Sequence, residues 1–226
     1  MPDPRKEQSL LTSRWKTIHK RLFKDIFPHA GEYRTYNITK REWVLNGETV
    51  LYASADSISD TLDYDFGQEK QFSYEGLSAS DAVKHIAKFS SGIWQIHPFC
   101  EGNTRSTAVF IIKYLKTFGF SVNNEIFAEN SWYFRNSLAR ANYNDLGKGI
   151  SATTIYLERF FENLLMGYKN ELKNRFIHVD YMGQSAIQSA TGDGSKCNNC
   201  TLEELKGLIR RENGKRNGRW EVLITI

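Results

Sequence analysis

The run HPFCEGNTR, residues 97–105, brings together residue types that could do chemistry. It holds a histidine, an acid, a glycine, an asparagine and an arginine within one short stretch. Pro98 disfavours the continuation of a helix through this run. The run therefore predicts a loop whose polar side chains have a purpose other than helix formation.

A loop of this kind between two helices is suited to bind an anion. The start of the second helix has unpaired N–H groups and a partial positive charge. Gly102 allows a positive φ and Asn103 tolerates similar conformations, so successive N–H groups can form a nest for phosphate oxygens. Arg105, one turn into the helix, adds a planar fork of donors that suits phosphate.

Glu101 and His97 add a metal ligand and a base to the same loop. A carboxylate repels a nearby phosphate unless a cation lies between them, and Mg²⁺ held by one carboxylate and substrate phosphates removes that conflict. His97, with an ordinary pKa of about 6.5, can accept a proton from an attacking hydroxyl. The loop therefore fits phosphate chemistry with a general base.

Each of these residues also has a structural explanation. A histidine can be a polar cap at a helix end, Glu101 and Arg105 have the spacing of a helical ion pair, and a loop glycine needs no ligand. No protein core requires all of them at this spacing, so their joint presence favours the functional interpretation.

Two apolar helices are predicted on either side of the loop. Before it, Ser78 and Asp81 resemble a capping box, and the apolar residues that follow step by three or four positions: Ala82, Ile86, Phe89, Ile93 and Ile96. After it, residues 106–120 are apolar almost all round and end near a glycine, which is typical of a buried helix and its stop. We expect a central helix–loop–helix.

Helical periodicity or capping signals also mark residues 9–23, 54–66, 130–142 and 150–176. The predicted fold class is therefore all-α, with one domain over residues 1–185. From residue 186 to 226 the chain is small, polar and then basic, and we expect a loosely attached tail with a short helix over residues 201–213. The basic residues of the tail leave open a nonspecific interaction with nucleic acid.

One segment departs from the helical pattern. Residues 43–53, WVLNGETVLYA, place Asn46-Gly47 between two short β-favouring runs, which predicts a β-hairpin with a type I′ turn. Two strands alone are marginal in water, so the hairpin must pack on the helices or present its edge to a partner. Both alternatives stay open from the residues alone.

Composition excludes several classes of protein. The 30 basic and 26 acidic residues give a net charge of +4, too small to require a nucleic-acid or membrane partner. No apolar signal segment and no apolar run of about 20 residues is present, so we expect a soluble, cytoplasmic protein. Three cysteines suggest no disulfide framework, and Cys197 with Cys200 falls short of the roughly four ligands that structural zinc needs.

The run HPFCEGNTR closely resembles the signature of the Fic family, HPFx(D/E)GNGR, which lies in a helix–loop–helix. Residues 43–53 look like the target-binding flap of that family, and residues 134–143, FRNSLARANY, fall where a further family helix is expected. The resemblance covers about residues 10–180.

The resemblance implies a protein adenylyltransferase that moves AMP from ATP to a Ser, Thr or Tyr hydroxyl and releases pyrophosphate. By resemblance, His97 activates the hydroxyl and Glu101 holds Mg²⁺. The phosphates of ATP would be bound by Gly102, Asn103, Thr104 and Arg105. The flap residues Val44, Leu45, Val50 and Leu51 would bind a target segment by strand addition. Phe99 would anchor the loop in the core, and the adenine pocket would lie near Tyr133, Arg140 and Tyr143.

Two positions depart from the family pattern. The second glycine of the signature is Thr104, and a second arginine, which the family uses on the γ-phosphate, is replaced by Ala108. The loss could weaken the orientation of ATP, change the donor nucleotide or leave a protein that only binds. Thr104 could cap the next helix or add a hydroxyl to the phosphate site. Because the base, the metal ligand and the first arginine are present, AMP transfer remains the favoured prediction.

The inhibitory motif of many Fic proteins, [ST]xxxE[GN], does not occur in the sequence. We therefore expect restraint by a separate antitoxin-like protein, as in a toxin–antitoxin pair, or none. The related Doc proteins, which act as kinases, carry a lysine where this chain has Thr104, so a kinase is the less favoured alternative.

Overall fold

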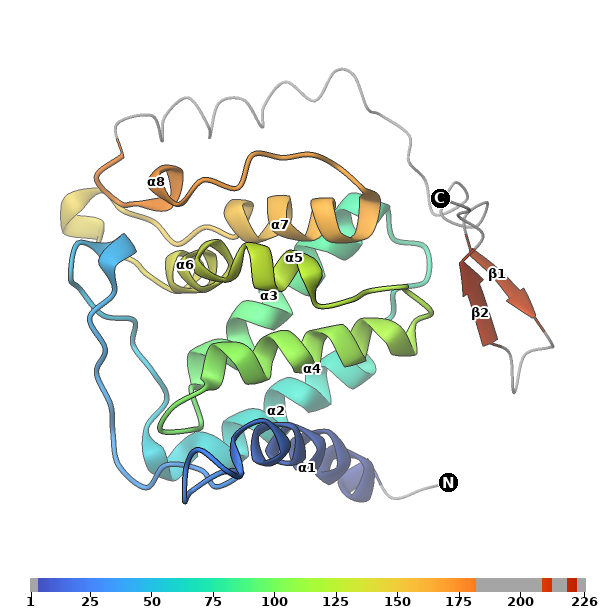
Figure 1. Ribbon diagram of the computed structural model, residues 1–226, viewed down its shortest axis with the longest axis horizontal. Coiled ribbons are helices and arrows are strands. Elements are labelled where there is room, and N and C mark those ends of the chain that lie inside the picture. The colour runs from blue at the N-terminus through green and yellow to red at the C-terminus, as the bar shows by residue number, and fades with distance from the viewer. Residues whose placement is uncertain (1–3, 182–208, 213–218, 223–226) are drawn as a thin grey trace.

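The structure is a computed structural model that describes residues 4–181, 209–212 and 219–222 (Figure 1). The α-helices are α1 (Pro4–Phe23), α2 (Ile58–Gln71), α3 (Ala79–Ile96), α4 (Asn103–Thr117), α5 (Glu125–Glu129), α6 (Ser131–Ala141), α7 (Ile155–Met166) and α8 (Asn174–Ile177). Short 3₁₀ helices are η1 (Trp43–Leu45), η2 (Ala55–Ser57) and η3 (Leu146–Lys148). The all-α prediction is confirmed for residues 4–181.

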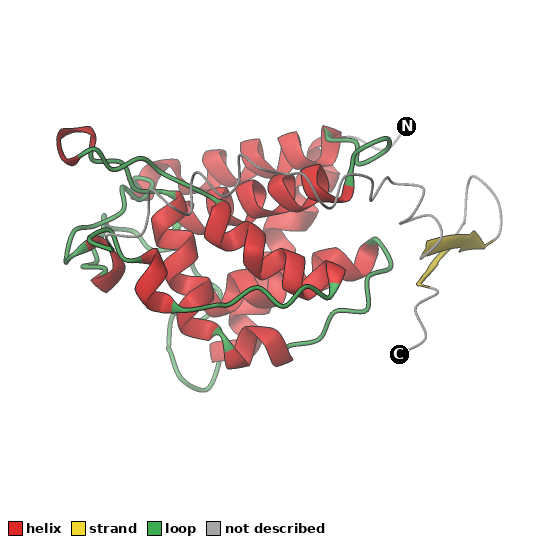
Figure 2. Ribbon diagram, turned by 90° about the horizontal axis from the view of Figure 1, so that it is seen from above, coloured by secondary structure: helices red, strands yellow, loops and turns green. Residues whose placement is uncertain are grey.

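Two short strands lie outside that range. β1 (Ile209–Glu212) pairs antiparallel with β2 (Arg219–Val222), and Figure 2 confines the strand colour to them. The predicted helix over residues 201–213 is therefore wrong at residues 209–212; the rest of that segment, and the proposed boundary at residue 185, lie outside the described residues.

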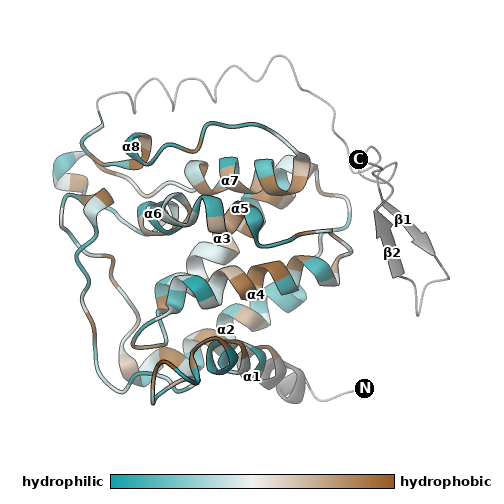
Figure 3. Cartoon of the chain, viewed as in Figure 1, coloured by the Kyte–Doolittle hydropathy of each residue, from teal (hydrophilic) through white to brown (hydrophobic). Residues whose placement is uncertain are grey.

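Helix α3 is the central helix. The Ser78 hydroxyl donates to the Asp81 carboxylate at 2.7 Å and accepts from the Asp81 N–H at 3.1 Å, so the predicted cap is present. Its apolar stripe is buried, and α3 packs against α2, α4, α6 and α7. Helix α4 lies across it, with a middle coloured hydrophobic in Figure 3. The chain between these two helices is the 97–105 loop, so the predicted helix–loop–helix is confirmed.

Aromatic packing fixes the loop to α1. The ring of Trp15, which is fully buried, lies edge-on to Phe99 of the loop and to Phe66 of α2, at centroid distances of 5.9 and 6.0 Å. Edge-to-face aromatic pairs at such distances are favourable beyond the area they bury. Phe99 is thus buried as predicted, and α1 supports the loop from below.

The predicted β-hairpin at residues 43–53 is wrong. Trp43–Leu45 form η1, and the described residues of this segment contain no strand. The chain does turn at Asn46-Gly47, where both residues have positive φ, 56° and 86°. Val44 and Leu45 are both 0% exposed; since consecutive strand residues point to opposite faces, two adjacent buried side chains favour a coiled turn instead.

Among the residues that the structure describes, no helix is long and apolar enough to cross a membrane.

Candidate active site

His97 lies at the C-terminal end of α3, where its ring packs against Tyr52. It adopts the left-handed conformation (φ 51°), and its N–H donates to the Trp94 carbonyl at 3.1 Å. The imidazole is 3% exposed and lies 4.3 Å from the Tyr52 ring, between centroids. Its Nδ1 is buried without a hydrogen-bond partner. A buried orphan nitrogen is costly unless a ligand or water completes it.

Burial is the largest cause, and the charge of Lys40 the second, of a pKa of His97 that is lowered to about 3. The imidazole is therefore neutral near pH 7, with a lone pair that can accept a proton. This is the protonation state that a general base needs before a reaction begins.

Arg34, which the sequence gave no reason to select, holds the end of α3 in place. Its guanidinium is 2% exposed and donates to the carbonyls of His97 at 2.8 Å, Tyr36 at 2.8 Å and Ala53 at 2.5 Å. The Arg34 N–H also donates to the Pro98 carbonyl at 2.8 Å. One buried side chain thus joins the loop to the chain segments on both sides of it.

Asn103 closes the loop on itself. Its amide accepts from the Phe99 N–H at 2.9 Å and donates to the Phe99 carbonyl at 2.7 Å, and the side chain is 3% exposed. Both of its polar groups are therefore used inside the loop. Asn103 can contribute to an anion nest only through its backbone N–H, not through its amide.

Gly102 and Arg105 both lie against the ring of Phe23 from α1. Gly102 has φ 77°, and a Cβ built on it would lie 2.4 Å from Phe23 Cε2, so only glycine fits. The Arg105 guanidinium lies 4.5 Å from the Phe23 ring centroid, which is within cation–π range. Arg105 is exposed and is thus held near the start of α4 with its donors facing solvent.

Helix α4 begins directly after Gly102. Its first intrahelical hydrogen bond runs from the Ser106 N–H to the Gly102 carbonyl at 2.9 Å. The N–H groups of residues 103–105 come before that bond and have no acceptor within the helix. Thr104 does not cap the helix: its hydroxyl accepts from the Trp94 indole N–H at 3.0 Å. Ala108 is buried on the next turn.

Glu101 presents its carboxylate to solvent. The side chain is 60% exposed, and both oxygens lie near Lys40 Nζ, at 3.4 and 3.5 Å. The main-chain carbonyl of Glu101 accepts from His19 Nε2 at 3.0 Å, because Nδ1 of that ring accepts from the Gly31 N–H. These bonds fix both the His19 tautomer and the backbone at Glu101.

The Glu101 carboxylate fits a Mg²⁺ ligand, since it is accessible, carries hard oxygens and already faces a cation. In the described part of the chain, Glu101 included, no three histidine, cysteine or acidic side chains gather to hold a metal. A magnesium ion at Glu101 would therefore take its other ligands from substrate phosphates and water, as Mg²⁺ commonly does.

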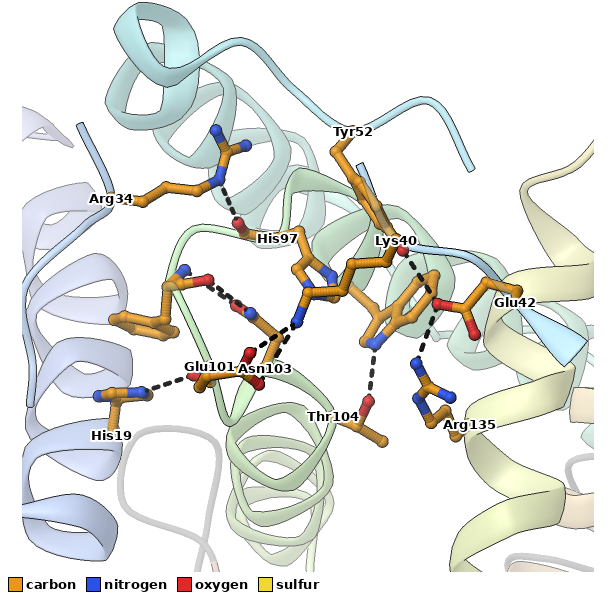
Figure 4. Close-up of polar contacts among 12 residues, drawn as sticks. His19, Arg34, Lys40, Glu42, Tyr52, His97, Glu101, Asn103, Thr104 and Arg135 are labelled. Atoms are coloured by element: carbon orange, nitrogen blue, oxygen red, sulfur yellow. Dashed lines mark hydrogen bonds and ion pairs between the residues drawn. The ribbon is translucent and has the colours of Figure 1, made fainter. Parts of the chain in front are cut away.

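Glu42 is a buried acid that sequence reasoning missed. It is 0% exposed, and its Oε1 accepts from the Tyr52 hydroxyl at 3.2 Å and from Arg135 of α6 at 3.0 Å (Figure 4). Burial raises the pKa of Glu42, which the Arg135 charge opposes. No pattern near Glu42 signals this role, because its charged partner Arg135 lies 93 residues away along the chain.

The predicted flap residues are mostly inaccessible. Val44, Leu45 and Val50 are buried, whereas Leu51 is 83% exposed. The residues expected around the adenine pocket, Tyr133, Arg140 and Tyr143, are also buried side chains. The structure thus brings together His97, Glu101 and the start of α4 but leaves only Leu51 of the flap set exposed to a partner; the roles of all these residues stay predictions.

Residues 4–181 thus form an all-helical fold with a helix–loop–helix site at its centre. Residues 9–115 match the model of the Fic/DOC family. The matched stretch includes the 97–105 loop and the first part of α4. Protein adenylyltransferase VbhT of Bartonella schoenbuchensis is 27% identical over 108 residues, which are 48% of this chain and 21% of VbhT. The chain therefore spans about one fifth of the length of this curated relative.

Solved structures of Fic proteins are similar to this chain in fold. BepC from Bartonella tribocorum, with bound AMPPNP, is similar with a TM-score of 0.52 and 19% identity, over 68% of this chain and 73% of BepC. The N-terminal Fic domain of an effector from Bartonella sp. AR 15-3 is similar with a TM-score of 0.52 and 22% identity, over 68% of this chain and 69% of that domain's chain. The effector BepA is similar with a TM-score of 0.51 and 19% identity, over 82% of this chain and 60% of BepA.

Proposed function

We propose that this protein is an adenylyltransferase that transfers AMP from ATP to a Ser, Thr or Tyr hydroxyl of another protein. The observation that carries the proposal is the setting of His97. A neutral buried imidazole with an unsatisfied nitrogen ends α3, in the same loop as an exposed carboxylate and next to the start of α4. The named activity of VbhT and the AMPPNP in BepC support the proposal.

The residues divide the reaction between them. His97 accepts the proton of the target hydroxyl as its oxygen bonds to the α-phosphorus, and the bond from that phosphorus to the bridging oxygen breaks to release pyrophosphate. The start of α4 and Arg105 bind phosphate oxygens. Glu101 would hold Mg²⁺, which supplies positive charge to the phosphates.

Access to His97 requires a change in the segment above it. His97 is 3% exposed and its imidazole packs against the Tyr52 ring, so we propose that a target hydroxyl reaches it when that ring moves aside. Leu51, next to Tyr52, is exposed and is the contact that we assign to the target. We assign no strand addition, because residues 43–45 coil into η1. We also propose that the reaction takes place in the cytoplasm and that a separate antitoxin-like protein restrains it.

Labelled ATP tests the proposal. The purified chain with Mg²⁺ and a bacterial lysate is given ATP labelled at the α- or the γ-phosphate, beside His97→Ala and His178→Ala as a matched histidine control. We expect protein label from the α-phosphate alone, lost at least about 100-fold in His97→Ala and kept in His178→Ala. Label from the γ-phosphate would identify a kinase instead. No label with ATP, GTP, CTP or UTP would favour a protein that only binds, for which the absence of an arginine at Ala108 is the reason.

A further inference from the structure

Lys40 extends across the 97–105 loop from the opposite side of the site. Its ammonium lies 3.4 and 3.5 Å from the two Glu101 oxygens, and Figure 4 shows the side chain passing between His97 and Glu101. The side chain is only 25% exposed. Its charge is also the second cause, after burial, of the low pKa of His97. Lys40 therefore lies at the centre of the candidate site.

The backbone that carries Lys40 is fixed. The Lys40 N–H donates to the Thr49 hydroxyl at 3.4 Å, and the Glu42 N–H donates to the Glu48 carbonyl at 2.9 Å. The buried Glu42 side chain is bound in turn by Arg135. The fold of the segment thus fixes the point from which the Lys40 side chain extends toward Glu101.

Stability does not explain this placement. An ion pair with a 60% exposed carboxylate at 3.4 Å is screened by solvent and contributes little to folding. A polyphosphate carries more negative charge than one carboxylate and offers several acceptor oxygens, so it would attract the ammonium more strongly. Helix α4 begins two residues after Glu101, and Arg105 lies in its first turn.

We propose that Lys40 is a phosphate-binding residue of the nucleotide site, whose ammonium leaves Glu101 for the phosphates of ATP when the nucleotide binds. This assignment rests on the proposed function. The alternative is that Lys40 only pairs with Glu101 and competes with Mg²⁺ for it. The two differ in sign: removal of a phosphate ligand weakens ATP binding, whereas removal of a competitor strengthens binding of ATP with Mg²⁺.

The test measures ATP affinity of the full chain by titration calorimetry, with and without Mg²⁺. Lys40→Met keeps the length of the side chain and removes its charge, and Arg41→Met makes the same charge change at the next residue, which is exposed. We expect Lys40→Met to bind ATP at least about tenfold more weakly in both conditions, as for one lost charged hydrogen bond. Lys40→Arg should retain most of the affinity, and Arg41→Met should bind like the wild type.

Loss of Lys40 also leaves Glu101 unpaired near the phosphates, so a second pair of variants removes that carboxylate. Without Mg²⁺, Glu101→Gln/Lys40→Met should bind ATP about tenfold more weakly than Glu101→Gln alone. Equal affinities in this pair, or tighter binding of Mg²⁺ and ATP by Lys40→Met, would overturn the assignment and leave the proposed function standing. A wild-type chain that binds no ATP would contradict both.

Discussion

At the scale of single residues, His97 links the chemistry of the site to the pH dependence of stability. Burial lowers its pKa to about 3 in the folded chain, whereas the unfolded chain keeps about 6.5. Between these values the unfolded chain binds more protons, so the contribution of His97 is fully present above pH 6.5 and is lost as pH falls. Through His97 we expect a loss of about 2 kcal/mol of unfolding free energy between pH 7 and pH 5.

Urea unfolding of the wild type and His97→Gln at both pH values measures this term. The variant should lose about 2 kcal/mol less on acidification than the wild type. Some acid sensitivity will remain, because burial also lowers the pKa of His19. If both chains lose the same stability between pH 7 and pH 5, the imidazole is not held neutral by burial.

Gly102 is limited by two separate effects. Its φ of 77° disfavours any side chain, and a Cβ would lie 2.4 Å from the buried Phe23 ring. We expect Gly102→Ala to lower the unfolding free energy by about 2–4 kcal/mol, since strained backbone and overpacking add. Calorimetric or urea unfolding measures the change.

Gly149→Ala is the matched control for Gly102→Ala. Gly149 has φ 67° but no atom within 4 Å of a built Cβ, so its substitution should cost only the backbone term of about 1 kcal/mol. Phe23→Leu in the Gly102→Ala background should recover part of the larger loss. Equal losses of unfolding free energy at the two glycines would show that the Phe23 ring moves to admit the new Cβ at no cost.

At the scale of elements, short sequence patterns predicted the helices and turns that are stabilised by contacts between residues close together in the chain. The helix α3 could be predicted because its cap, its apolar period and Pro98 lie within one stretch of sequence. The turn at Asn46-Gly47 was also predicted, since both residues tolerate positive φ. The predicted helix over residues 150–176 instead ends at Met166, because Gly167 takes the left-handed C-cap.

Non-local contacts decided the elements that the sequence did not predict. Residues 43–45 form a 3₁₀ turn, in which the adjacent side chains of Val44 and Leu45 are both buried in the core. A pattern of β-favouring residues does not reveal this double burial. Arg34 reaches a carbonyl 63 residues away, and Glu42 reaches a side chain 93 residues away. Such pairs carry no spacing signal, so the loop could be predicted from the sequence but its supporting residues could not.

At the scale of the whole molecule, the last buried side chain of the described hydrophobic core lies in α8. Among the residues whose burial is described, Ile177 in α8 is the last buried apolar side chain. Asn174 accepts from the Asn136 amide at 2.7 Å, and the Val179 N–H donates to the Val44 carbonyl at 3.0 Å. These contacts attach α8 to α6, and the residues just after α8 to η1.

Two truncations test this arrangement. A chain that ends at residue 181 should unfold at the same urea concentration as the full chain and keep its transfer activity. A chain that ends at residue 173 lacks Ile177 and should lose about 2–5 kcal/mol, as for removal of one large buried aliphatic side chain. If the chain that ends at residue 181 loses activity but not stability, residues 182–226 act on the target or on a nucleic acid, and the domain boundary near residue 185 separates folding from function.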